Sequence, residues 1–281
     1  MASLASKLLF CEGGPGSTDI IVIRAAIANP SITVRPVGSK RALMAFVEDP
    51  MIPADCACMA IRDRDFDFLP VGTPPSLLRT HPTLPIYAWQ RLEIENYLLD
   101  GPVLKPAYDA LRASQAASLP EACEAELTAY LGDAAREIGS YQAARWTLGQ
   151  LRPSVGWPYL RRDWCDAFRL PADRSREGCW ESVIEEVGLF AGRSREVSEA
   201  RAERLFDDFH TQFGDPEFVS RQQHTTWFSG KDLLASLMER LNLPVGAAKI
   251  MARHGRDALV KIGPSNSHPD FAELAHLAAQ L

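Results

Sequence analysis

The chain has 281 residues, of which 46 % are hydrophobic and 23 % are charged, and its formal net charge is −6. These values are in the range of globular proteins with one large core or two smaller ones. The negative charge excludes a protein that holds nucleic acid by bulk positive charge, because Lys and Arg on phosphates supply most non-specific affinity. Contact with nucleic acid must therefore be local, for example through cations held by carboxylates.

No run of residues approaches the roughly 18 to 20 apolar residues of a membrane span, and the apolar run near the N-terminus is too short for a secretory signal. We therefore expect a cytoplasmic protein. The six cysteines form no CxxC pair and have no histidine at zinc spacing, so neither a disulfide framework nor a structural zinc site is expected. Most cysteines are predicted to be small buried apolar side chains.

The first hundred residues are predicted to alternate between strands and helices. Short apolar or β-branched runs predict strands at residues 7–13, 31–37, 56–63 and 84–90. Helical spacing predicts helices at residues 17–30, 39–49 and 93–100. Strands separated by helices of this length indicate right-handed crossovers, so we expect an α/β fold with a mainly parallel sheet.

The composition changes beyond residue 101. Segments rich in Ala, Glu, Arg and Leu and broken by proline predict a largely helical insertion or second subdomain over residues 102–217. Residues 218–281 are predicted to be helical as well, and to return to the α/β core formed by residues 1–101. No internal repeat or low-complexity tract is found.

Acidic residues follow three of the predicted strands. Glu12 follows the first, Asp63 and Asp65 follow the third, and Glu95 comes shortly after the fourth. Because parallel strands end at one edge of a sheet, these carboxylates are expected to converge there. An extended backbone would point Asp63, Asp65 and Asp67 to the same side. Carboxylates suit Mg²⁺ or Mn²⁺, although any one Asp after a strand is as often a turn or cap residue.

The glycine-rich turn after Glu12, GGPGSTD, has two rival interpretations. It lacks the Gly-Lys-Ser/Thr ending of a phosphate-binding P-loop, and Asp19 stands where the third glycine of a dinucleotide fingerprint would be. A sharp strand-to-helix turn beside the acidic residues explains the glycines better, with Ser17 or Thr18 as the helix cap.

These motifs resemble the Toprim family, the catalytic domain shared by type IA topoisomerases, bacterial primases, recombination-mediator proteins and the overcoming-lysogenization-defect (OLD) nucleases. The family pattern is a glutamate and a glycine after the first strand and an Asp-x-Asp after a later one, matched here by FCEGGPGSTD and IRDRDFD. RLEIENYLLD is similar to a segment of OLD-like proteins whose glutamate, matching Glu95, completes the metal site. The nearest resemblance is to stand-alone Toprim proteins encoded beside ABC-type ATPases in anti-phage operons, the AriB-like group, and residues 7–100 carry most of it.

The resemblance implies a Rossmann-like Toprim fold and two-metal hydrolysis of phosphodiester bonds. The residues expected to bind Mg²⁺ or Mn²⁺ are Glu12, Asp19, Asp63, Asp65, Asp67 and Glu95. Asp19 matches a further acidic ligand of OLD-like proteins that lies a few positions after the glutamate. Here it is further from Glu12 in the sequence, because the glycine turn is longer. The expected catalytic set is Glu12, Asp63, Asp65, Glu95 and Lys231.

Lys231 enters this set because OLD-like enzymes are expected to use a lysine for charge stabilisation. It begins a predicted helix about 136 residues beyond Glu95. The positive end of the helix dipole disfavours a cation there, so a lysine at this position indicates a functional role and not a contribution to helix stability. We expect Lys231 within roughly 10 Å of the acidic residues, against the alternative of a solvated surface lysine. His224 could reach the same edge, although a lone histidine is more often structural.

Basic side chains offer weaker candidates for contact with nucleic acid. Four of them lie in loops near the expected acidic edge: Lys40, Arg41, Arg62 and Arg64. The middle of the chain mixes arginines with aromatic residues that could stack on bases, namely Arg145, Trp146, Trp157, Tyr159, Arg161, Arg162 and Trp164. Solvated arginines and buried tryptophans of a helical region explain both groups at least as well.

The leading function is a Mg²⁺- or Mn²⁺-dependent Toprim nuclease acting on DNA or RNA. The resemblance further implies an anti-phage defence effector controlled by a partner ATPase, because the chain has no Walker motif of its own. A homodimer is left open. The alternative is a non-catalytic Toprim module for assembly in DNA repair or recombination. A topoisomerase needs a larger strand-passage body and a primase usually brings a zinc module, so both are disfavoured.

Overall fold

A five-stranded sheet forms the first part of the chain in the computed structural model, which describes residues 7–47, 56–70, 77–114, 119–155, 168–190, 197–244 and 246–281. The strands are β1 (Lys7–Cys11), β2 (Ile32–Pro36), β3 (Ala57–Arg62), β4 (Leu78–Arg79) and β5 (Ile86–Ala88). Their order is β2-β1-β3-β5-β4. Strands β2, β1, β3 and β5 are parallel to one another, and β4 pairs antiparallel with β5. The predicted α/β fold with a mainly parallel sheet is confirmed.

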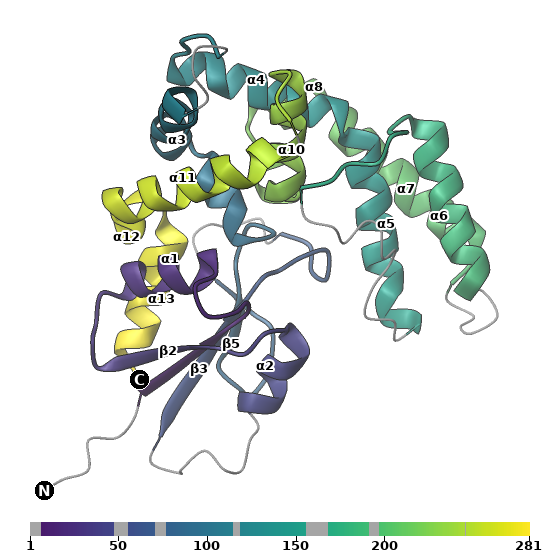
Figure 1. Ribbon diagram of the computed structural model, residues 1–281. Helices are drawn as coiled ribbons and strands as arrows, with labels where there is room; N and C mark the ends of the chain where they lie inside the picture. The colour runs from purple at the N-terminus through teal and green to yellow at the C-terminus, as the bar shows by residue number, and fades with distance from the viewer. Residues whose placement is uncertain are drawn as a thin grey trace, which may run out of the picture.

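Helices cover both faces of the sheet. Alternate residues of a strand point to opposite faces, so Leu9 of β1 belongs to the buried cluster that includes Ile23 of α1 (Thr18–Ile27), whereas its neighbour Phe10 belongs to a second cluster with Leu43 of α2 (Lys40–Val47). Figure 1 shows α1 on one side of the sheet and α2 on the other. Because β2, β1, β3 and β5 are parallel, they end at the same edge of the sheet, which we call the carboxyl edge.

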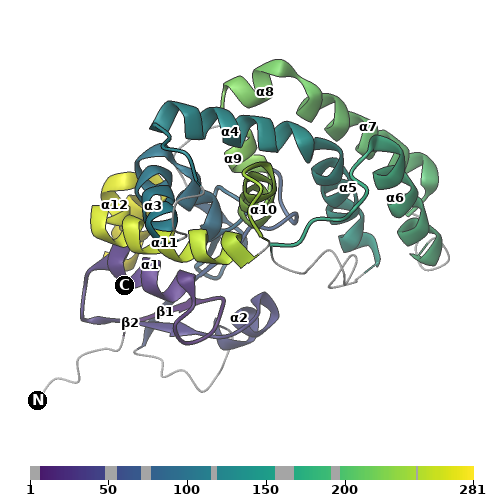
Figure 2. The same ribbon diagram turned by 45° about the horizontal axis from the view of Figure 1, so that its top comes forward.

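A large helical region lies beyond the carboxyl edge (Figures 1 and 2). The short 3-10 helix η1 (Ile94–Leu99) leads into it. Its helices are α3 (Gly101–Ser114), α4 (Glu124–Glu137), α5 (Gly139–Val155), α6 (Arg176–Phe190), α7 (Glu199–Gly214), α8 (Pro216–Ser220) and α9 (His224–Trp227). One continuous cluster of buried apolar side chains extends from the sheet into these helices. Their packing therefore continues that of the sheet.

The last part of the chain returns to the sheet. Its helices are α10 (Gly230–Arg240), α11 (Gly246–Ile262), α12 (Pro264–Ser267) and α13 (Pro269–Ala279). Both α11 and α13 pack against α1, and α11 also packs against α3 and η1. Within the described residues, no helix is long and apolar enough to span a membrane. Of the five cysteines described there, only Cys11 and Cys179 are buried, fewer than expected.

The start of α10 is joined closely to η1. The Asn96 side chain is fully buried; its Nδ2 donates to the carbonyl oxygens of Thr225 (2.8 Å) and Phe228 (2.7 Å), and its Oδ1 accepts from the backbone N–H groups of Glu93 (3.1 Å) and Gly230 (3.2 Å). A Cβ atom at Gly230 would lie 2.5 Å from the backbone nitrogen of Asn96. Glycine is therefore required where the two helices meet.

Gly230→Ala is expected to destabilise the protein by on the order of 1–3 kcal/mol, because backbone atoms on η1 cannot move away as a flexible side chain would. The measurement is the free energy of unfolding in urea. Gly188→Ala is the matched control: Gly188 is an exposed residue of α6 whose added Cβ meets nothing within 4 Å. The control should be neutral or stabilised by up to about 1 kcal/mol, and equal losses in the two variants would contradict the close approach at Gly230.

Candidate functional site

Two acidic residues follow neighbouring strands at the carboxyl edge. Glu12 comes directly after β1 and Asp63 directly after β3, and the last residue of β1, Cys11, is paired with Ile61 of β3. The two carboxylates are close enough for Glu12 to contribute to the raised pKa of Asp63. The parallel sheet thus brings together the acids that follow its first and third strands, as expected.

The glycine turn places a third carboxylate beside them. Gly13 has φ +87°, and a Cβ there would lie 2.6 Å from Oγ of Ser17, which caps α1. Asp19 lies in the first turn of α1. Its charge raises the pKa of both Asp63 and Glu95. Asp19 is therefore part of the same acidic group, despite its displacement by the longer turn.

A fourth and a fifth carboxylate come from the segment around η1. Glu95 lies in η1 and Glu93 immediately precedes it, and both are buried. Nζ of Lys231, the second residue of α10, lies 2.5 Å from Oε2 of Glu93 and 3.1 Å from Oε2 of Glu95. The expectation that Lys231 returns to the acidic edge across 136 residues is confirmed in position.

Glu93 was not among the predicted site residues, yet it makes the closest contacts to the lysine. Its Oε1 accepts hydrogen bonds from Oγ of Ser229 (2.7 Å) and from the backbone N–H of Lys231 (2.9 Å). Burial alone would raise the pKa of Glu93, but the charge and hydrogen bonds of Lys231 lower it below the usual value. A local signal for Glu93 was present in the sequence: RLEIENYLLD contains two glutamates with one residue between them, Glu93 and Glu95, and both contact Lys231.

Burial and mutual repulsion shift the remaining ionisable groups. Burial, with repulsion from Asp19 and Glu12, raises the pKa of Asp63 well above its ordinary range. Burial also raises the pKa of Glu95 to about 7, although Lys231 opposes the shift. Burial would lower the pKa of Lys231, but its carboxylate neighbours hold it well above the ordinary value. Lys231 thus stays charged among groups that repel one another.

Asp65 and Asp67 do not follow the expected alternation. The backbone at Asp65 has φ +48°, in the left-handed region, so the segment after β3 turns instead of remaining extended. Asp65 stays near Asp63 and contributes to its raised pKa. Asp67 forms ion pairs with Arg62 and Arg152. The structure therefore does not place Asp67 with the acidic cluster, which we define as Glu12, Asp19, Asp63, Asp65, Glu93 and Glu95.

Of the basic residues near the edge, Arg64 forms hydrogen bonds within the protein. Arg64 is fully buried, and its guanidinium donates to the carbonyl oxygens of Phe68 (2.7 Å) and Thr226 (2.6 Å), so it has no access to a phosphate. Trp146 is also fully buried, as the structural interpretation of the tryptophans required. The side chains of Lys40 and Arg41, and all of Trp157, Tyr159, Arg161, Arg162 and Trp164, lie outside the described residues.

His224 lies away from the acidic cluster. It is buried beside α4 and α8, where it lines a pocket of about 440 Å³ together with Thr128, Gly132 and Val219. Burial, assisted by nearby arginines, lowers the pKa of His224 to about 4. The structural interpretation of this histidine therefore fits better than a role at the carboxyl edge.

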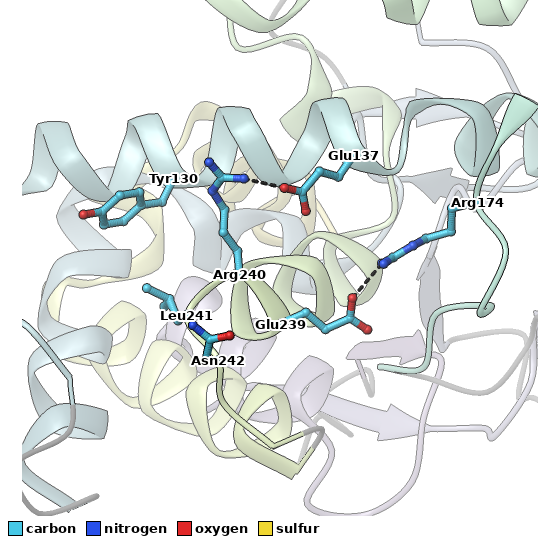
Figure 3. A pocket seen from close by; sticks show the side chains of 7 residues that line it. All are labelled: Tyr130, Glu137, Arg174, Glu239, Arg240, Leu241 and Asn242. Carbon is cyan, nitrogen blue, oxygen red and sulfur yellow. Dashed lines mark hydrogen bonds and ion pairs between the residues drawn. The ribbon is translucent and has the colours of Figure 1, made fainter.

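A larger polar pocket, of about 670 Å³, lies where α4 meets the end of α10 (Figure 3). Arg240 pairs there with Glu137, and Nη1 of Arg174 lies 2.7 Å from Oε2 of Glu239. Each of these carboxylates already faces an arginine. Among the side chains shown in Figure 3, no pair combines a nucleophile with a base, so this pocket is a poor candidate for catalysis.

The acidic cluster has the chemistry of a site for a hard divalent cation. Its side chains are all oxygen donors, and Oδ1 of Asp63 is buried without a hydrogen-bond partner among the described residues. In that part of the chain, no three His, Cys, Asp or Glu side chains converge closely enough to hold a metal ion as they stand. Nζ of Lys231 lies between Glu93 and Glu95 instead. The donor set fits a cation, and its binding requires these side chains to rearrange.

No protein-family model matches the chain, and no curated protein matches it. Function is therefore inferred from the chemistry of the site.

Asp63→Asn is expected to stabilise the protein in EDTA at pH 8, by on the order of 1 kcal/mol. The raised pKa of Asp63 means that its charged form disfavours the folded state at high pH, and the amide cannot ionise. The gain should shrink as the pH falls through that raised pKa, because the wild-type carboxyl is then neutral as well. The measurement is the urea unfolding free energy at pH 8 and at pH 5.

Asp67→Asn is the control for this prediction and should have the opposite sign. It breaks the ion pairs with Arg62 and Arg152 and should cost about 1–3 kcal/mol at pH 8. A loss of stability in Asp63→Asn as large as that in Asp67→Asn would show that the Asp63 carboxylate is not held among like charges.

Proposed function

We propose that this protein is a divalent-metal-dependent nuclease of the Toprim type that hydrolyses phosphodiester bonds. The observation that supports this most strongly is the acidic cluster: the carboxylates around η1 contact one partly buried lysine at the carboxyl edge, and those after β1 and β3 lie beside them. Ligands of parallel α/β sheets bind at this edge. Paired carboxylates with a nearby cation are typical of phosphoryl-transfer sites.

Glu12, Asp63 and Glu95 would hold the Mg²⁺ or Mn²⁺ ions, with Asp19 and Asp65 beside them. When bound, such cations supply Lewis acidity and lower the pKa of a water molecule. Nζ of Lys231 would offset the charge that develops on the phosphate oxygens. Glu93 accepts one hydrogen bond from that ammonium, a second from the backbone N–H of Lys231 and a third from the hydroxyl of Ser229, and so holds the lysine in place. Burial of Glu93 and Glu95 limits the access of bulk water to the two carboxylates that contact Lys231, which strengthens these electrostatic interactions.

Within this proposal, the resemblance of residues 7–100 to OLD-like and AriB-like Toprim proteins suggests a defence role. Control would come from a partner ATPase, since the sequence contains no Gly-x4-Gly-Lys-Ser/Thr motif. DNA and RNA are both compatible substrates, because the cluster would engage the phosphodiester backbone that they share.

A second candidate function is a non-catalytic Toprim module that assembles with other proteins. One observation favours it: Lys231 satisfies Glu93 and Glu95 directly, and no three acidic side chains of the described residues converge on a cation position. A permanent internal ion pair of this kind would serve stability instead of chemistry. Metal binding and cleavage, measured separately, decide between the two functions.

The first measurement is metal affinity. Mn²⁺ should bind about tenfold more tightly at pH 8 than at pH 6, because Glu95, with a pKa of about 7, must lose its proton to become a ligand. Isothermal titration calorimetry gives both dissociation constants. Glu95→Gln should bind more weakly and lose the part of the pH dependence that Glu95 contributes, while the part due to the raised pKa of Asp63 remains. An affinity that is equal at the two pH values in the wild-type protein would remove Glu95 from the metal ligands.

The second measurement is cleavage of labelled single- and double-stranded DNA and RNA with Mg²⁺ or Mn²⁺. EDTA, Glu12→Gln and Asp63→Asn should each abolish cleavage, and Lys231→Ala should reduce it by on the order of a hundredfold or more. The matched control is Asp207→Asn, because Asp207 is an acidic surface residue of α7 that pairs only with Arg176 among the contacts described. Its activity should equal that of the wild-type protein.

The same variants must be tested in cells that express the neighbouring genes, because an isolated effector can be inactive without its partner. Loss of phage protection or of toxicity in Glu12→Gln and Asp63→Asn, but not in Asp207→Asn, is the expected result. Full protection by both site variants would support the assembly module and exclude the nuclease.

A further inference from the structure

The helical region contacts the lysine segment of the site through α5. Gln142 of α5 is fully buried; its Oε1 accepts from the backbone N–H of Ser229 (3.2 Å) and its Nε2 donates to Oδ2 of Asp232 (2.7 Å). These two residues flank the start of α10, where Lys231 lies. One side chain of the helical region thus binds the backbone of Ser229 and the carboxylate of Asp232, on either side of Lys231.

The hydrogen bonds continue from Gln142 to the acidic cluster. Ser229, whose N–H group Gln142 binds, donates its own hydroxyl to Oε1 of Glu93 (2.7 Å). The same oxygen accepts from the backbone N–H of Lys231 (2.9 Å). Ser229 and Asp232 are each at most 4 % exposed, so water does not compete for these bonds. An unbroken buried path therefore leads from α5 to Lys231.

Arg145, one turn further along α5, reinforces this path. Its guanidinium forms an ion pair with Oδ2 of Asp232, the oxygen that also accepts from Gln142. Its charge over the ring of Phe66 ties the same helix to the turn that follows β3. Gly149 of α5 approaches that turn closely as well, since a Cβ there would lie 2.5 Å from Cβ of Phe66. Two segments of the site are thus held by one helix.

We propose that Gln142 is a positioning residue through which the helical region holds Lys231 against Glu93 and Glu95. The proposal rests on the nuclease function for its catalytic consequence, but the placement of Lys231 can be tested without it. An amide is suited to this task because it accepts from an N–H group and donates to a carboxylate at the same time. Any partner or ligand that shifts α5 would, by this path, shift the lysine.

The alternative is that Gln142 only fills and stabilises the core. The two roles differ in what happens when the amide is lost but the volume is kept, as in Gln142→Met. A structural role predicts lower stability with Lys231 still in place. A positioning role predicts that Ser229 and Asp232 are released and that Nζ of Lys231 leaves the carboxylates that shield it.

The experiment measures the acetylation rate of Lys231 in the folded full chain, by brief exposure to N-hydroxysuccinimidyl acetate and peptide mass spectrometry. In Gln142→Met, Lys231 should react about tenfold faster than in the wild-type protein, since the loss of the two hydrogen bonds of Gln142 releases the segment that holds the amine. The exposed Lys249 and Lys261 serve as internal standards in every sample. Circular dichroism verifies that each variant is folded at the temperature of labelling.

The matched control is Thr147→Val on the same helix. Thr147 is equally buried, and its hydroxyl bonds only the carbonyl oxygen of Ala143 within α5 (2.8 Å) among the contacts described. It should lose stability but leave the labelling of Lys231 unchanged. A Lys231 labelling rate in folded Gln142→Met equal to that of the wild-type protein would overturn the proposal.

Cleavage kinetics add a second, independent readout. Gln142→Met should lower kcat by about tenfold and leave KM within about threefold, because Lys231 acts on developing charge and not on ground-state binding. An unchanged kcat in the folded variant would also overturn the proposal. If no form of the protein cleaves nucleic acid and the site variants still protect cells that express the neighbouring genes, the nuclease function fails, and the labelling experiment still decides whether Gln142 positions Lys231.

Discussion

The contact of one ammonium group with two carboxylates is the interaction on which this site depends. Carboxylates gathered at the carboxyl edge repel one another, and the burial of Glu93 and Glu95 adds to the cost of their charges. Nζ of Lys231 offsets this repulsion for Glu93 and Glu95 directly and for Asp63 at longer range. Without a cation at this place, several of the carboxyls would have to remain protonated at neutral pH.

Holding a lysine there is itself unfavourable, which explains the buried polar network around it. Lys231 stands in the first turn of α10, where the helix dipole opposes a positive charge. Glu93 counters that effect, while Asn96 and Gln142 accept hydrogen bonds from the backbone N–H groups of Gly230 and Ser229. Every one of these contacts joins segments that are distant in the chain. The site is therefore a product of the tertiary fold and not of one local motif.

Local patterns predicted those parts of the site that follow from sheet geometry. Strand-following acids such as Glu12 and Asp63 were predictable because the strands are parallel and neighbours. Asp67 was misplaced because one left-handed residue, Asp65, reverses the direction of the chain after β3. The two-residue strand β4 escaped notice because it is too short to show a period.

The residues that hold the lysine could not be predicted in the same way. Lys231 was expected at the edge from a family resemblance, whereas Gln142 and Asn96 had no signal. Their partners in the segment from Thr225 to Asp232 lie from 87 to 134 residues away, and a buried amide looks like any other polar residue in a helix pattern. The burial of Arg64 was missed for a similar reason, since its acceptor on Thr226 is 162 residues distant.

The order of the chain has a consequence for how this edge is made during synthesis. Ribosomes complete the acidic residues of β1, β3 and η1 long before they reach α10, which lies about 136 residues after Glu95. The nascent sheet can pair its strands in that interval, because all of them lie within the first hundred residues. Its acidic edge, however, still lacks the charge that balances it. The edge therefore reaches its final arrangement only after α10 has been translated. Helices α3 to α9, which precede α10 in the chain, are synthesised before Lys231 is available to the acidic residues.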